Sequence, residues 1–427
     1  MRPSTKATAD HAATRTCLPA LMAIAGLLLA SAAASAAATG ERPNRRLCVT
    51  DFGAVGDGAT DDSPAFQKAL EAVVAAGRGT LIVPPGDYRL ARLVSAEVTS
   101  SSLAILGDGA GVSNLIGDNA SGVLRLHDER CQWHVVVKDI AFLARREGSG
   151  TALEVSSPPR GVRNFRTLLV ENVEIRGEGL PTRQYFDHGI KAIAQWRPLF
   201  LNVVIGGVLD PALKKEQKEE GDDSALCRST CGIQADFCYA PSFQHCYVWG
   251  AQTGYRVVSL GRPQGPEDCA FYRSNAVGCR VGIDVDTPIP EPQLVIESCH
   301  INCRDVGVRL SRRKFFQITG NLFYGGDNSE APYTDILVKD SFAGVISQNI
   351  FHSPDRDNLK PPPSSNRTMI HLTGPRARDL VITDNVFNAK GTTLVSDEET
   401  TGVILANNRF SNPYATPPGP WGNPEQR

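Results

Sequence analysis

The sequence has almost no net charge. Its 44 Lys and Arg residues nearly balance 46 Asp and Glu residues, which leaves a formal net charge of -2 at pH 7. A nucleic-acid-binding protein would carry a basic excess, so no nucleic-acid partner is expected.

Long hydrophobic runs are also scarce. The one clear case, LPALMAIAGLLLASAAA, follows Arg2, Lys6 and Arg15 and leads into the small-residue sequence ASA (34–36). This order is typical of a secretory signal peptide, because the apolar part is short for a membrane span. We expect residues 1–36 to be removed and the mature chain to be secreted or periplasmic, without stable membrane insertion. An uncleaved anchor is the alternative.

The cysteines show no complete metal-binding motif. Removal of Cys17 with the signal leaves ten of the 11 cysteines, an even number that permits disulfides in an exported protein without forcing any pairing. The spacing of Cys227 and Cys231 resembles half a zinc site, but no histidine or second close pair lies at zinc-like spacing around it. No metal and no cofactor are therefore expected.

Downstream of residue 120 one short pattern recurs: a small residue, an apolar residue, a variable residue and a second apolar residue. Examples are GVLRL, GIKAI and GIDVD. The first apolar position of successive copies is occupied by Leu124, Leu153, Ile190, Ile233, Tyr255, Ile283, Val308, Ile336, Ile370 and Leu394. The intervals range from 22 to 43 residues. These intervals have a nearly constant minimum length with irregular additions. This predicts coils of one circumference that carry loops of different length.

Period-two alternation and a turn asparagine follow in the later copies, as in FFQITGNLFYGG and DLVITDNVFNAK. One register of this second part is occupied by Asn321, Asn349, Asn385 and Asn408. The shared register predicts side-chain amides that hydrogen-bond from coil to coil. Cys246 and Cys299 fall in the same register, and we interpret them as buried members of this stack.

Hairpin signals of the Asn-Gly type are absent, and no helical periodicity separates the strands. The expected fold class is therefore all-β: a right-handed parallel β-helix, a single-stranded solenoid with an N-terminal capping α-helix. We expect one domain over residues 45–412, with coils at about 80–412 and a Pro/Gly-rich tail at 413–427.

The capping helix is predicted from DFGAVGDGATDDSPAFQKAL, residues 51–70. This stretch lacks the glycine pattern of a phosphate loop and the spaced acidic ligands of a calcium loop. Asp62 or Ser63 as N-cap and Pro64 in the first turn predict a helix at about residues 63–76. Its apolar face contains Phe66, Leu70, Val73 and Val74. Such a helix can cover the open end of a β-helix, where unpaired backbone would promote aggregation.

The same stretch, followed by GTLIVPPGDYRL, resembles the N-terminal signature of the pectate lyase superfamily over residues 49–90. That superfamily includes polygalacturonase-type hydrolases, rhamnogalacturonases, alginate C5-epimerases and phage tailspike depolymerases. The resemblance implies a β-helix and a polysaccharide substrate, with calcium as a possible cofactor if the chain is a lyase. It does not imply a reaction. Of the polygalacturonase motifs only Asp222-Asp223 matches, and YFDHG (185–189) shares only its aspartate and histidine with the Asp-Pro-His-Glu of alginate epimerases.

Strand residues alternate between core and solvent, so the residue after each inward apolar position is expected to form an outward column. This column reads Arg125, Glu154, Lys191, Gln234, Arg256, Asp284, Arg309, Leu337, His371 and Val395. A second outward column two residues further along includes Asp236 and Asp286. The longest interval of the repeat, 43 residues between Ile190 and Ile233, lies beside the middle of both columns. Long polar loops over a rigid scaffold often carry binding residues.

The predicted catalytic residues are Lys191, Asp236, Arg256, Asp284, Asp286 and Arg309. Coils stack about 4.8 Å apart, so Asp236 and Asp286 are expected roughly 10 Å from each other. The acid and base of inverting glycosidases are about 6.5–9.5 Å apart, and Asp284 is a diagonal alternative partner for Asp236. The cations can instead neutralise a uronate carboxylate, and one of them can remove the adjacent C5 proton if burial or a nearby like charge lowers its pKa towards neutral pH. A solvated face of alternating charge is the structural alternative.

Substrate binding is predicted for His188, Gln234, Tyr239 and Tyr272. His188 can also act as a base, although a turn histidine with ordinary hydrogen bonds is an equal alternative. The tyrosines can stack on sugar rings, and simple packing explains them as well.

These patterns predict a secreted enzyme that cleaves a polysaccharide, with an acidic, uronate-containing one favoured, by β-elimination or hydrolysis. A polysaccharide C5-epimerase and a non-catalytic glycan-binding β-helix are the alternatives. An unsaturated product would indicate a lyase, new reducing ends without it a hydrolase, and binding without either a non-catalytic module.

Overall fold

The computed structural model describes residues 45–98, 102–130, 134–159, 165–179, 183–208, 227–262, 265–325, 332–352, 366–389, 391–410 and 415–416. They all belong to the unit Asn44–Arg427. The expected signal peptide, residues 1–36, lies outside the described residues. Across the described ranges, no helix has the length and apolar character needed to cross a membrane.

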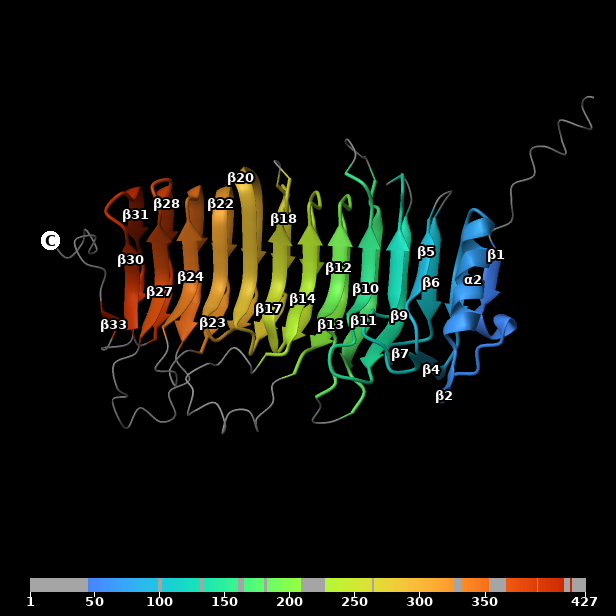
Figure 1. Cartoon of the computed structure of the whole chain (residues 1–427). Coiled ribbons are helices and arrows are strands. Elements are labelled where there is room, and N and C mark those ends of the chain that lie inside the picture. The colour runs from blue at the N-terminus through green and yellow to red at the C-terminus, as the bar shows by residue number, and fades with distance from the viewer. Residues whose placement is uncertain are drawn as a thin grey trace, which may run out of the picture. The chain divides into compact units, whose positions relative to one another are not determined.

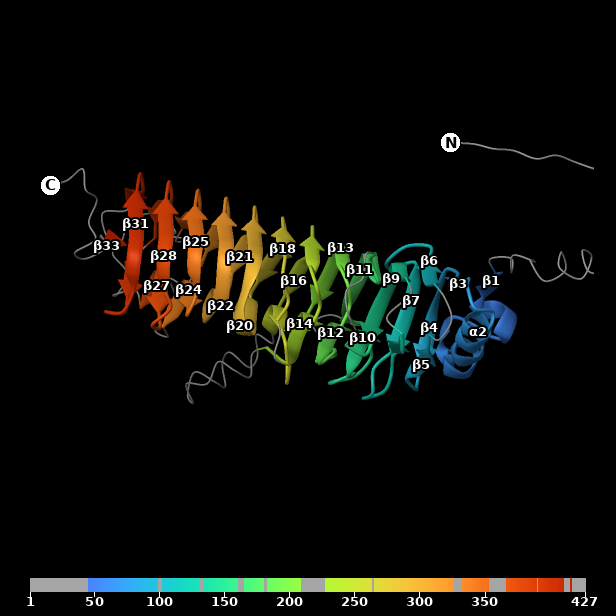
Figure 2. The ribbon, with the colours of Figure 1, turned by 90° about the horizontal axis from the view of Figure 1, so that it is seen from above.

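The chain winds into a parallel β-helix whose coils contribute strands to three faces (Figures 1 and 2). The first face contains β5 (Val94–Glu97), β8 (Leu124–His127), β10 (Thr151–Ser156), β12 (His188–Ile193), β14 (Ser229–Asp236), β17 (Ala251–Val258), β24 (Tyr333–Lys339), β27 (Arg367–Thr373), β30 (Gly391–Ser396) and β33 (Ala415–Thr416). The second face contains β1 (Arg45–Cys48), β3 (Gly79–Val83), β6 (Leu103–Gly107), β15 (Ser242–Gln244), β18 (Cys269–Tyr272), β25 (Phe342–Ser347), β28 (Arg378–Thr383) and β31 (Thr401–Ala406).

The third face contains β2 (Asp57–Asp61), β4 (Gly86–Leu90), β7 (Ser113–Gly117), β16 (Tyr247–Trp249), β19 (Asn275–Val277), β21 (His300–Asn302), β23 (Leu322–Tyr324), β26 (Ile350–His352), β29 (Val386–Asn388) and β32 (Arg409–Phe410). Some strands bend from one face to the next. From second to third run β9 (Val135–Ala144), β11 (Leu168–Gly177) and β13 (Leu199–Gly206); from first to second run β20 (Val281–Glu297) and β22 (Val306–Thr319). The predicted parallel β-helix is confirmed.

The inward register of the first face is the one that the sequence predicts. Each copy of the repeat pairs with the next at the same position, as Ile190 does with Ile233 and Ile233 with Tyr255. These three side chains are fully buried. Coil pairing begins before residue 80, because β1 pairs with β3 and β2 pairs with β4. It continues past residue 412, because β33 pairs with β30.

One α-helix, α2 (Ser63–Ala75), covers the first coils beside the 3₁₀ turn η1 (Val49–Phe52). Its core side contains Phe66, Leu70 and Val73, which are buried as predicted. Asp62 stands at the N-cap, but its carboxylate does not cap the helix. It accepts hydrogen bonds from the backbone N–H groups of residues 55 and 56 at 2.7 and 3.1 Å. The aspartate thus fixes the glycine-rich turn against the helix start, which makes the stretch a scaffold.

The predicted asparagine ladder is present at the turn between the second and third faces. The side-chain Nδ2 of Asn321 donates to Oδ1 of Asn349, which repeats the contact to Asn385, and Asn385 repeats it to Asn408, each at 3.0 Å. The backbone N–H of Cys299 donates to Oδ1 of Asn321 at 2.8 Å. Cys299 therefore continues the ladder as a buried free thiol, as the sequence predicts.

Candidate active site

The outward column predicted from the sequence forms on the first face. Lys191 of β12 pairs with Gln234 of β14, which pairs with Arg256 of β17. Arg256 pairs with Asp284 of β20, and Asp284 pairs with Arg309 of β22. Neighbouring coils therefore present these side chains in one line.

His188 joins this face, although strict alternation would direct it inward together with Ile190. The burial pattern of β12 shows that two consecutive residues, Gly189 and Ile190, are buried between half-buried neighbours. A Cβ at Gly189 would lie 2.6 Å from the carbonyl oxygen of Gly232, which explains why a small residue opens this copy of the repeat. Because two consecutive residues of β12 are buried, the alternation shifts by one residue, and His188 lies on the same side of the strand as Lys191.

The imidazole of His188 is neutral at neutral pH. Burial, together with the positive charges of Lys191 and Arg256, lowers the pKa of His188 to about 4. A neutral imidazole can accept a proton, so His188 has the protonation state required of a general base.

Asp284 is the anionic centre of the column. Its carboxylate accepts two hydrogen bonds from Arg309, Nε to Oδ1 and Nη2 to Oδ2, each 2.8 Å long. On the other side, Nε of Arg256 lies 3.8 Å from Oδ2, beyond hydrogen-bond distance. Arg309 is thus engaged in a bidentate ion pair, whereas Arg256 is only partly neutralised.

Two cations of the column keep free binding capacity. Nε of Arg256 is buried and has no hydrogen-bond partner in the described part of the chain. Lys191 forms no ion pair with any of the described residues. An anionic group of a ligand placed between β12 and β17 would find two incompletely neutralised positive charges.

The two carboxylates of the second column lie in different environments. Asp236 is buried and accepts a hydrogen bond from the backbone N–H of Leu260 at 3.0 Å. Burial raises the pKa of Asp236. Asp286 is 48% exposed and forms an ion pair with Arg312. Val258 pairs with both aspartates, so they are two coils apart, as predicted.

The two predicted tyrosines do not join the column. Tyr272 belongs to β18 on the second face. Tyr239 stacks on Trp196 with ring centroids 4.4 Å apart, and its hydroxyl donates to Asp268 at 3.1 Å. It lies three residues before the second-face strand β15, which begins at Ser242. Sequence alternation identifies outward residues but not the face, because the turn positions between faces are not periodic.

Tyr185 is a candidate that the sequence patterns did not single out. A Cβ at Gly148 would lie 4.0 Å from the Tyr185 hydroxyl and 3.6 Å from Oδ1 of Asp187, so both side chains border one spot at the start of β12. Asp187 also accepts a hydrogen bond from the backbone N–H of Gly150 at 3.1 Å. Burial raises the pKa of Tyr185, so its hydroxyl is a proton donor at neutral pH. The signal that could have found it is its place in YFDHG.

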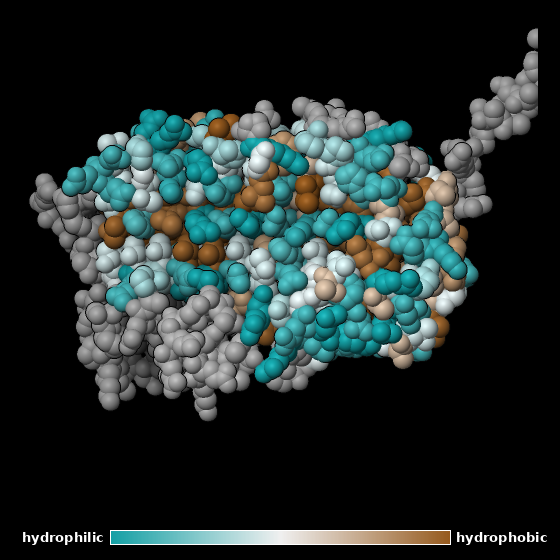
Figure 3. Space-filling view, viewed as in Figure 1, coloured by the Kyte–Doolittle hydropathy of each residue, from teal (hydrophilic) through white to brown (hydrophobic). Residues whose placement is uncertain are grey.

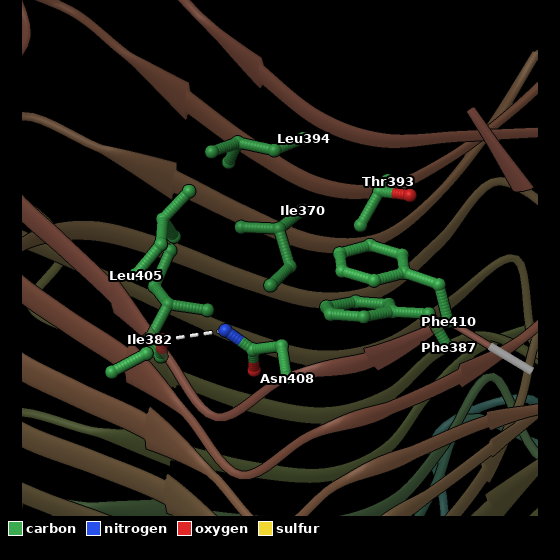
Figure 4. Close-up of a pocket in the computed structure, with 9 residues that line it drawn as sticks. Ile370, Ile382, Phe387, Thr393, Leu394, Leu405, Asn408 and Phe410 are labelled. Atoms are coloured by element: carbon green, nitrogen blue, oxygen red, sulfur yellow. Dashed lines mark hydrogen bonds between the residues drawn. The ribbon is translucent and has the colours of Figure 1, made fainter. Parts of the chain in front are cut away.

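Apolar side chains form a pocket elsewhere, at the C-terminal end of the β-helix (Figure 4). It is lined by Ile370, Ile382, Phe387, Thr393, Leu394, Leu405, Ala406, Asn408 and Phe410. Its lining is nearly all hydrocarbon, so it offers no acid, base or cation for catalysis. Figure 3 shows, in the orientation of Figure 1, that hydrophilic side chains cover much of the surface between smaller hydrophobic patches.

No group of three or more His, Cys, Asp or Glu side chains within the described ranges is arranged to hold a metal ion. The expectation of a metal-free site remains a prediction, as does calcium for a lyase.

Residues 47–130 match the family model described as Rhamnogalacturonase A/epimerase, pectate lyase-like. The resemblance to the pectate lyase superfamily is therefore confirmed for this segment. The matched segment ends before the candidate site, so no residue role is transferred with it.

The proteins that match this chain in sequence are enzymes that modify polysaccharides. The chain is 60% identical to Mannuronan C5-epimerase AlgE1 of Azotobacter vinelandii over 40 residues, 9% of this chain and 3% of that protein. It is 43% identical to Alginate lyase 7 of the same organism over 67 residues, 15% of this chain and 8% of that protein. The matches thus span only a small part of these relatives.

The structural likeness extends over most of the chain. The A-module of Mannuronan C-5 epimerase AlgE4 from Azotobacter vinelandii superposes with a TM-score of 0.54 and 16% sequence identity. The superposition covers 88% of this chain and all of that module. At this identity the likeness establishes the β-helix fold alone.

Proposed function

We propose that this protein modifies an acidic polysaccharide by removing the C5 proton of a uronate residue on the first face. One observation carries the proposal: burial, together with the positive charges of Lys191 and Arg256, lowers the pKa of His188 and keeps this imidazole neutral on the face that carries both cations. A base next to incompletely neutralised cations suits a substrate whose reacting carbon is attached to a carboxylate.

The chemistry follows from that pairing. Lys191 and Arg256 neutralise the uronate carboxylate, which makes the adjacent C5–H bond more acidic and stabilises the charge that develops on the carboxylate oxygens. His188 takes the C5 proton. The electron pair of the broken C5–H bond moves into the carboxylate to give an enediolate.

The enediolate can react in two ways. In β-elimination, the electrons form a C4–C5 double bond while the C4–O bond breaks, and the leaving oxygen takes a proton. In epimerisation, a donor returns a proton to C5 from the opposite side. Tyr185 carries the proton for either step. The names of the relatives include an epimerase and a lyase, which supports the shared first step.

Hydrolysis is the second candidate, favoured by the raised pKa of Asp236. In that mechanism Asp236 protonates the leaving oxygen and Asp286 activates water from about 10 Å away. Asp286 is held in an ion pair with Arg312, and Asp284 is engaged with Arg309. Proton abstraction needs no such ion pair to break, so we rank it first.

One experiment separates these reactions. The secreted protein is incubated in D₂O with polymannuronate, polyguluronate and polygalacturonate. Unsaturated uronate absorbance indicates elimination, deuterium at C5 without absorbance indicates epimerisation, and new reducing ends without either indicate hydrolysis. Binding without any signal would identify a non-catalytic module and refute the proposal.

Matched variants assign the site. His188→Ala and Lys191→Ala should each lower turnover by about a hundredfold or more, the scale of a lost acid–base or electrostatic group. His371→Ala, in the same column further along, should cost less than about tenfold because it lies away from the middle coils. Equal effects at Lys191 and His371 would move the reaction to another face.

A further inference from the structure

The third face has a gap in one of its outward columns. Ile175 of β11 pairs with Ile205 of β13, and Gly206 of β13 pairs with Trp249 of β16. Arg176, Gly206 and Trp249 are therefore consecutive in the column. A Cβ at Gly206 would meet only the Cβ of Arg176 at 3.4 Å and the carbonyl oxygen of Ile175 at 4.0 Å. We name this position the Gly206 gap.

One wall of the Gly206 gap is aromatic. Tyr247 and Trp249 both belong to β16, two residues apart, so their side chains leave the same face about 7 Å from each other. Other surface aromatics contact one another in pairs: Trp196 packs at a tilt against Tyr239, and Tyr324 stacks on His352. No ring stacks on Tyr247 or Trp249 among the described residues.

The opposite wall is polar and the floor is apolar. Nε of Arg176 donates to Oε1 of Glu174 at 2.5 Å, and its Nη1 donates to the carbonyl oxygen of Gly177 at 2.9 Å. The Arg176 side chain is still 40% exposed and keeps a free terminal nitrogen. Val204, which pairs with Tyr247 beside the gap, is 40% exposed, far more than a core valine.

We propose that the Gly206 gap is a second glycan-binding site that holds one uronate ring of a polysaccharide, away from the residues that carry the chemistry. The strands of the two walls are separated by two coil spacings, about 10 Å. A pyranose ring over Gly206 lies about 5 Å from either wall, within the range over which ring faces pack. Its apolar face contacts Trp249, and its carboxylate and hydroxyls contact Arg176 and Glu174.

The site is distinct from the candidate active site. The third-face strand β13 ends at Gly206, and the first-face strand β14 begins at Ser229. The residues of the Gly206 gap belong to the third face, whereas His188 and Lys191 belong to the first-face strand β12. The identity of the sugar as a uronate rests on the proposed function, whereas the stacking geometry does not.

Affinity electrophoresis of the full mature chain tests the site in gels that contain polymannuronate, polyguluronate, polygalacturonate or neutral dextran. Trp249→Ala removes the aromatic wall, and Gly206→Leu fills the gap where space exists for a side chain. Each should weaken the affinity for at least one acidic polymer by about tenfold or more. Arg176→Gln should weaken binding to that polymer and leave dextran mobility unchanged. Phe315→Ala is the matched control, because Phe315 is an exposed aromatic side chain of β22, away from the third face, and this variant should leave affinity unchanged.

The site is refuted if the folded Gly206→Leu protein binds like the wild type, if the wild type binds none of the acidic polymers, or if dextran binds equally well. If Trp249→Ala fails to fold, the affinity of Gly206→Leu for the acidic polymers still tests the site. Failure of the two proposals can be told apart, because binding is measured without turnover. Retained binding with loss of turnover in His188→Ala supports both sites. Binding at the gap in a protein without turnover refutes only the proposed function.

Discussion

Replacing Asn349 with alanine should destabilise the β-helix more than the same replacement at a less buried asparagine of the ladder. Asn349 is fully buried in the middle of the ladder. Its Oδ1 accepts hydrogen bonds from the backbone N–H and the Nδ2 of Asn321, each 3.0 Å long. Its Nδ2 donates to the carbonyl oxygen of Ile318 at 2.9 Å. Asn349→Ala therefore leaves two donors and one acceptor without partners.

The magnitude follows from those three groups. A buried polar group that loses its partner costs about 1–3 kcal/mol, so the variant should lose about 3 kcal/mol or more in the free energy of unfolding. Asn408→Ala is the matched control at the end of the ladder. Asn408 accepts the same pair of hydrogen bonds from Asn385 but is only half-buried, so water can replace its amide. Its loss should stay near about 1 kcal/mol.

Urea unfolding followed by circular dichroism measures both variants, with the midpoint and slope fitted separately. The wild-type spectrum should be dominated by β-structure with a small contribution from α2. An Asn349→Ala protein that unfolds at the same urea concentration as the wild type would refute the ladder as a stabilising element. Equal loss in both variants would show that burial does not control its strength.

Three further predictions concern the site and the cap. The pKa of His188 is about 4 in the folded chain, below the usual value near 6.5, so unfolded chains bind this proton first and stability is lost as pH falls from about 6.5 towards 4. Turnover with His188 as base should persist to about pH 4 in a pH–rate profile, and an acidic limb near 6.5 would exclude that role. Phe66→Asp should cause aggregation or loss of secretion, because it places a charge against the first coils; normal yield and melting would mean that the helix does not protect the core. Arg309→Met should lower the midpoint of thermal unfolding, because buried Asp284 loses both hydrogen bonds from Arg309. Asp284→Asn in the same chain should restore part of the midpoint, and an unchanged midpoint in Arg309→Met would show that the pair is not stabilising.

The sequence predicts the register of the first face well because each coil repeats one short pattern. Small-apolar-x-apolar positions mark the inward residues, and parallel pairing then aligns every outward residue with its counterpart in the next coil. Lys191, Gln234 and Arg256 are neighbours in the column for that reason. The capping helix is predictable because Pro64 and the spacing of Phe66 and Leu70 are local signals.

The contacts within the column are not predictable in the same way. Arg256 and Arg309 both flank Asp284, and the sequence treats them alike. Side-chain geometry makes Arg309 the bidentate partner and leaves Arg256 beyond hydrogen-bond distance. The sequence also does not assign Tyr272 to a face, because period two reports the direction of a side chain but not which face its strand joins.

The recognisable family signature and the proposed chemistry lie in different parts of the chain. The matched segment, residues 47–130, contains the first coils and α2, and α2 covers the end of the β-helix. The candidate base and cations begin only at His188, in coils that share the fold with the relatives at low identity. A β-helix tolerates this division, because each coil contacts mainly its neighbours and outward residues can change without affecting the cap. The reaction must therefore be assigned from turnover of the middle-coil variants, since the residues that identify the family do not reach them.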